Sequence, residues 1–105
     1  MQIAKVRGTV VSTHKTPSLT GVKLLVLQFI DENGEVLPKY EVAADTVGAG
    51  IDEWVLVTRG SAARADNNGN QSRPLDALVV GIIDTVTIDN NLLYSKRDEY
   101  RQRLS

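Results

Sequence analysis

The most informative stretch of the chain reads Val47-Gly48-Ala49-Gly50-Ile51-Asp52-Glu53-Trp54-Val55-Leu56-Val57-Thr58-Arg59-Gly60-Ser61-Ala62-Ala63-Arg64. It places a short apolar strand between two loops of very small residues. Small residues let backbones approach closely or take positive φ, so we expect something to crowd both ends of this strand. No clear catalytic group is present, and the predicted neighbour is a second copy of the chain. The candidate interface residues are Gly48, Ala49, Gly50, Gly60, Ser61, Ala62, Ala63 and Arg64.

The second small-residue loop has an alternative interpretation. Its backbone N–H groups could cradle an anion, with Arg64 as the counter-charge. The interpretation we favour pairs Arg64 with a carboxylate across a subunit contact. Gly48 and Gly50 do not make a dinucleotide fingerprint, because they precede a strand and not a helix.

Alternating apolar residues and turn signals predict an all-β domain. The five predicted strands cover residues 2–12, 22–30, 35–44, 53–58 and 78–88. The strand at 22–30 is apolar on both faces, as expected in a closed structure or an interface. One or two short helical turns are predicted near 60–64 and 74–77. The fold class that fits is a small five-stranded OB-like barrel spanning residues 1–97, followed by a polar tail at 98–105.

Single residues predict the irregularities of this barrel. Gly8 inside the first strand predicts a bulge or sharp bend, and Pro38 predicts an edge or a bulge. Asn33-Gly34 predicts a hairpin turn, with Asp31 helping to shape it. Asn90-Asn91 predicts a turn before a few strand residues at 92–94.

Composition sets the limits on function. The chain has 105 residues, enough for one modest core, and it has no Cys, which excludes Cys-based zinc sites and Cys nucleophiles. With 12 Lys+Arg against 13 Asp+Glu the net charge is -1, so bulk charge does not attract nucleic acid or an anionic membrane. The start does not resemble a signal peptide, and no apolar run reaches the roughly 20 residues that span a bilayer.

An enzyme would need convergent titratable groups, and the sequence does not indicate them. The only His, His14, lies in a Thr/Ser/Pro loop, where a solvated role is the favoured interpretation. The carboxylates are scattered, with no spacing that demands acid–base chemistry or metal binding. We therefore predict no catalytic residue, no metal site and no cofactor.

A single-stranded nucleic-acid module is the alternative function, because OB barrels often bind single strands. Such binding needs stacking aromatics and a basic groove. The aromatic residues are 5% of the chain and are spread along it, and the basic residues cluster in the tail among acidic ones.

Several segments together resemble one family, the EutN/CcmL vertex proteins of bacterial microcompartments. They are the stretch quoted above, Arg73–Asp84, Met1–Thr13, Leu24–Ile30 and Leu92–Lys96. Each segment is weak alone, but their order and extent are specific over residues 1 to about 97. Within the family, the segments are most similar to the branch found in cyanobacterial β-carboxysomes.

The resemblance implies a structural role without catalysis. It implies an OB-like barrel that forms a homopentamer at the vertices of an icosahedral carboxysome shell, in the cytoplasm. The facets of such a shell are hexameric proteins, and the shell encloses the enzymes of photosynthetic carbon dioxide fixation. The implied partners are four further copies and those hexamers, with no nucleic acid and no membrane.

Overall fold

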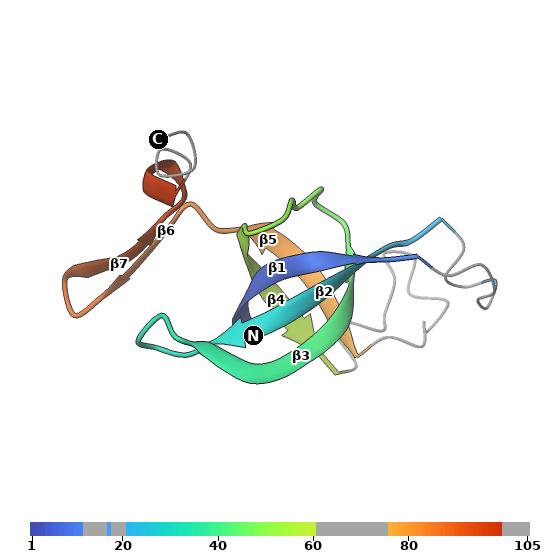
Figure 1. Cartoon of the computed structure of the whole chain (residues 1–105), viewed down its shortest axis with the longest axis horizontal. Coiled ribbons are helices and arrows are strands. Elements are labelled where there is room, and N and C mark those ends of the chain that lie inside the picture. The colour runs from blue at the N-terminus through green and yellow to red at the C-terminus, as the bar shows by residue number, and fades with distance from the viewer. Residues whose placement is uncertain (12–16, 18–20, 61–75, 100–105) are drawn as a thin grey trace.

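The computed structural model describes residues 1–11, 17, 21–60 and 76–99, and it contains seven strands. They are β1 Gln2–Val10, β2 Lys23–Ile30, β3 Val36–Asp45, β4 Trp54–Arg59, β5 Ala77–Ile82, β6 Thr85–Ile88 and β7 Asn91–Ser95. Strands β1–β5 close a barrel in the order β1-β2-β3-β5-β4, in which only β3 and β5 run parallel (Figure 1). The predicted five-stranded barrel is confirmed.

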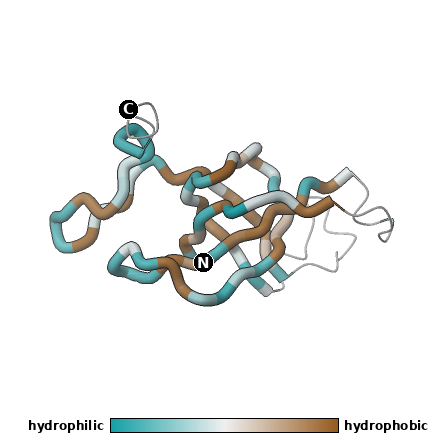
Figure 2. The backbone as a smooth tube through the Cα atoms, in the orientation of Figure 1, coloured by the Kyte–Doolittle hydropathy of each residue, from teal (hydrophilic) through white to brown (hydrophobic). Residues whose placement is uncertain are grey.

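The core of the barrel comes from the inward positions of these strands. Its largest fully buried side chains are Phe29, Leu25, Leu27, Val6, Val55, Val57 and Val79. Figure 2 shows the hydrophobic colour concentrated along the barrel strands and returning in the hairpin outside them. Both faces of β2 are used within one chain, since Leu25 and Leu27 face the barrel core while Ile30 joins a second cluster with Trp54.

The predicted irregularities of the first three strands are confirmed. The β1–β2 register shifts between Val6 and Gly8, and the β2–β3 register shifts opposite the segment that contains Pro38. Gly34 has φ +82° in the β2–β3 turn. The Asp31 Oδ1 atom accepts hydrogen bonds from the Asn33 and Glu35 amides at 2.9 and 3.0 Å.

The prediction of one long strand at 78–88 is wrong. Strand β5 ends at Ile82, which pairs with Val55, and its partner β4 has only Trp54 left beyond that pair. The Ile83 amide donates to the Trp54 carbonyl oxygen at 2.9 Å, and the chain then leaves the barrel as β6. Strands β6 and β7 form a separate two-stranded hairpin that projects from one end of the barrel (Figure 1).

Two local predictions in the C-terminal part of the chain also need correction. The turn lies at Asp89-Asn90, with φ of 52° and 64°, so Asn91 already belongs to β7. Ala77 begins β5 opposite Arg59 and is not part of a helical turn. In the described part of the chain, the α-helical turn covers residues 96–99, and the Ser95 Oγ atom accepts the Asp98 amide hydrogen at 3.4 Å.

Candidate subunit interface

The first small-residue loop, residues 46–52, is held in shape by one buried carboxylate. The Asp45 side chain is fully buried and accepts hydrogen bonds from the amides of Val47, Gly48 and Ala49 at 3.0, 3.1 and 2.9 Å. Lys23 adds an ion pair to Asp45 at 3.5 Å and donates to the Ala49 carbonyl oxygen at 3.2 Å. A carboxylate that satisfies three successive amides makes a stiff loop.

The small residues of this region have explanations within a single chain. Gly48 and Gly60 adopt φ of +79° and +74°, a conformation that L side chains rarely take. Ala49 is 1% exposed and belongs to the barrel core. The Gly50 amide donates to Glu53 Oε1, and a Cβ atom added at Gly50 would lie 3.2 Å from that oxygen. Contact of Gly48, Ala49, Gly50 and Gly60 with a second chain therefore stays a prediction, since small size alone does not require it.

The other predicted interface residues, Ser61, Ala62, Ala63 and Arg64, lie outside the described residues, as does His14.

Sequence reasoning missed the apolar side chains that the first loop exposes. Val47 and Ile51 flank the Gly-Ala-Gly run and are 39% and 49% exposed. The sequence did contain a signal for this surface, namely one large apolar residue at each end of the small-residue run.

An apolar groove of about 340 Å³ lies between the barrel and the β6–β7 hairpin. Its apolar walls include Ile3, Trp54, Leu56, Val86, Ile88 and Leu93, and its lining also contains the carboxylates Asp31 and Glu32. One end is closed by the β2–β3 turn, where a Cβ atom added at Gly34 would lie 3.2 Å from Leu93. No short motif could have revealed this groove, because its lining comes from positions 1 to 93.

The hairpin beside the groove is held by stacking and by an ion pair. The Trp54 and Tyr94 rings stack with centroids 4.2 Å apart and planes 10° from parallel. The Lys96 Nζ atom lies 2.7 Å from Glu53 Oε2, and this hydrogen bond raises the pKa of Lys96. Burial raises the pKa of Tyr94, which is only 4% exposed. These contacts hold the hairpin in the position that forms one wall of the groove.

The described residues offer little for catalysis or nucleic-acid stacking. Within residues 1–11, 17, 21–60 and 76–99, no three His, Cys, Asp or Glu side chains converge as metal ligands. Of the aromatic residues in those ranges, Phe29, Trp54 and Tyr94 are buried, and Tyr40 is 69% exposed. One exposed ring does not make a stacking platform for successive bases. The same part of the chain contains no helix with the length and apolar character needed to cross a bilayer.

Comparison with known proteins gives close matches over nearly the whole chain. Carboxysome shell vertex proteins CcmL of Gloeobacter violaceus and of a Nostoc species are 66% and 68% identical, each match covering 96% of this chain and 100% of the relative. The solved G. violaceus structure superposes with a TM-score of 0.87 at 65% identity, over 93% of this chain and 100% of that one.

A more distant match bears on assembly. The GrpN pentameric microcompartment shell protein from Rhodospirillum rubrum is 47% identical, with a TM-score of 0.75 over 86% of this chain and 100% of that one. The family model described as ethanolamine utilisation protein EutN/carboxysome matches residues 1–84. The chain belongs to the EutN/CcmL family.

Proposed function

We propose that this protein is a structural subunit that forms pentamers and closes the vertices of a carboxysome shell. The observation that carries the proposal is the pattern of identity. Five relatives named carboxysome shell vertex proteins are 63% to 68% identical, whereas the vertex proteins PduN, GrpN and EutN of other microcompartments are 38% to 48% identical. The chain also covers 98% to 100% of those five relatives.

A five-membered ring suits this role for a geometric reason. A flat layer of six-sided tiles has no curvature, and points of five-fold symmetry introduce the curvature that closes it. A head-to-tail contact forms such a point when its rotation closes after five copies. The hexameric facet proteins are then the partners at the outer edge of the ring, and the protein itself needs no catalytic group.

The two small-residue loops are the proposed contacts between protomers. They comprise Gly48, Ala49 and Gly50 in the first loop and Gly60, Ser61, Ala62, Ala63 and Arg64 in the second. The buried Asp45 clamp supports this placement of the first loop, because a stiff loop loses little conformational entropy when it docks.

Native mass spectrometry of the purified chain tests the proposal. One chain has a mass of 11.5 kDa, so five copies give 5 × 11.5 kDa, about 57.5 kDa. We expect that mass to dominate at micromolar concentration. A mass of one chain at every concentration tested refutes the proposed function.

A further inference from the structure

We propose that the groove between the barrel and the β6–β7 hairpin receives the 46–52 loop of the neighbouring copy in the ring. This inference rests on the proposed pentamer and adds the two surfaces that meet. The loop would seat Val47 and Ile51 of one protomer against the apolar wall that Trp54, Leu56 and Ile88 form in the next.

The described residues line this groove and leave its interior open. The Trp54–Tyr94 stack and the Lys96–Glu53 ion pair hold the base of the hairpin beside the apolar wall. A two-stranded hairpin is only marginally stable alone. Its inward residues Val86, Ile88 and Leu93 face a space of about 340 Å³ that a partner's side chains can occupy.

The 46–52 loop combines a fixed backbone with exposed apolar side chains. The Asp45 carboxylate fixes its backbone, and Val47 and Ile51 are exposed although both are large and apolar. Burying these two side chains against a second apolar surface would remove them from water without the entropic cost of ordering the loop.

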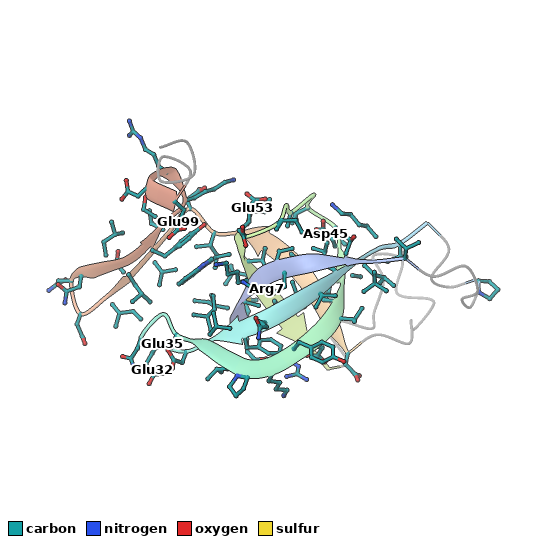
Figure 3. All side chains as sticks on the ribbon, in the orientation of Figure 1. Arg7, Glu32, Glu35, Asp45, Glu53 and Glu99 are labelled. Atoms are coloured by element: carbon teal, nitrogen blue, oxygen red, sulfur yellow. The ribbon has the colours of Figure 1, made fainter. Side chains whose placement is uncertain are left out.

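Charge complements the apolar fit. Glu32 belongs to the lining of the groove, and Figure 3 shows Glu32 and Glu35 together at the β2–β3 turn. The loop is bordered by β1, where the Val6 carbonyl oxygen accepts the Asp52 amide hydrogen at 2.8 Å. The next residue, Arg7, is exposed. Acidic side chains along the groove and an exposed arginine beside the loop lie on two different surfaces, which favours a head-to-tail contact over a symmetric one.

A pair of cysteines tests the contact, because the natural chain contains none. Ile51→Cys and Ile88→Cys are combined in one chain, and Ile51→Cys with Leu92→Cys is the matched control. Leu92 pairs with Thr87 and does not line the groove, so it shares the hairpin but not the wall. After mild oxidation we expect the first pair to give a ladder up to five chains that a reducing agent abolishes, and at least 10-fold less cross-linking from the control pair.

A second measurement does not depend on oxidation. Ile88→Asp places a carboxylate in the apolar wall, and Leu92→Asp is its control. We expect Ile88→Asp to raise the concentration for half-dissociation of the ring about 100-fold, as an unpaired carboxylate at an apolar contact should, with little change for Leu92→Asp.

The outcomes separate the two proposals. A wild-type pentamer in which the two cysteine pairs cross-link equally, or in which Ile88→Asp assembles as Leu92→Asp does, overturns the groove contact and leaves the proposed function standing. A wild-type chain that stays monomeric overturns both.

Discussion

Replacing Asp45 by Ala is the most direct test of the stiff loop. The substitution removes the acceptor of three amide hydrogen bonds of 2.9 to 3.1 Å from a fully buried side chain. Hydrogen bonds to a charged group contribute about 1.5–3 kcal/mol each. The Val47 and Gly48 amides can turn to water, so we discount two of the three bonds and expect a total loss of about 3 kcal/mol in the free energy of unfolding.

Thermal unfolding at fixed protein concentration, followed by Trp54 fluorescence, measures this loss. One kcal/mol moves the melting temperature of a small domain by about 4–8 °C, so the expected decrease is about 12–24 °C. The melting temperature of Asp45→Asn should lie between those of Asp45→Ala and the unsubstituted protein. Its side-chain amide retains one acceptor oxygen for the Val47 and Gly48 amides but turns a donor toward the Ala49 amide.

Asp31→Ala is the matched control, since Asp31 Oδ1 accepts two amide hydrogens in a solvent-exposed turn. We expect a loss of about 1 kcal/mol there. If Asp45→Ala is no more destabilising than Asp31→Ala, the carboxylate does not hold the loop, and the reasoning that makes the loop a stiff insert fails.

Two further predictions concern the backbone and pH. Gly48→Ala and Gly60→Ala should each destabilise the protein by about 1–2 kcal/mol, because both glycines have positive φ. Gly8→Ala is the control and should change stability little, since its added Cβ atom would meet nothing within 4 Å. Urea titrations in which Gly8→Ala is as destabilising as the other two would contradict the assignment of backbone strain. The pKa values of Tyr94 and Lys96 are raised, so both groups hold their protons more tightly in the folded state. Their contribution to stability is therefore complete below their ordinary pKa values of 10.0 and 10.5. It is lost as the pH rises through their pKa values in the folded protein. Melting temperatures measured from pH 8 to 11 should therefore fall above about pH 10. The fall should be smaller for Tyr94→Phe than for the unsubstituted protein. An identical fall in the two proteins would contradict the contribution of the Tyr94 phenol.

The barrel could be predicted from the sequence because its causes are local. Strand alternation, Gly8, Pro38 and Asn33-Gly34 each act through the backbone near them, and each prediction was confirmed. The break after Ile82 could not be predicted in this way. The apolar run continues past Ile82. Strand β5 nevertheless stops there because its pairing partner β4, more than twenty positions earlier in the chain, begins at Trp54 and has almost no residues left to pair with it.

The candidate site was only half visible for the same reason. The small residues at 48–50 stand out in the sequence, but the clamp that shapes them is Asp45, an ordinary carboxylate until its three amide bonds are known. The groove is wholly long-range, since β1, β4 and the hairpin each supply part of its wall.

One carboxylate joins the two halves of the proposed contact. Glu53 accepts the Gly50 amide hydrogen on Oε1 and binds Lys96 through Oε2 at 2.7 Å, so it ties the 46–52 loop to the base of the hairpin. The rotation from one protomer to the next depends on how insert and groove are oriented in each chain. If the proposed contact is correct, Glu53 should therefore influence the angle at which the ring closes.

Glu53→Ala should broaden the distribution of ring sizes more than it lowers stability, because the barrel core remains while the loop and hairpin lose their common anchor. Lys96→Met is the control, since it removes the ion pair at the base of the hairpin but leaves the Gly50 contact in place. Native mass spectra should show five-membered rings mixed with other sizes for Glu53→Ala and a narrower distribution for Lys96→Met. Uniform pentamers from Glu53→Ala would mean that closure is set by the contact surfaces alone, because a heterologous contact whose rotation is fixed by its own packing needs no internal tie.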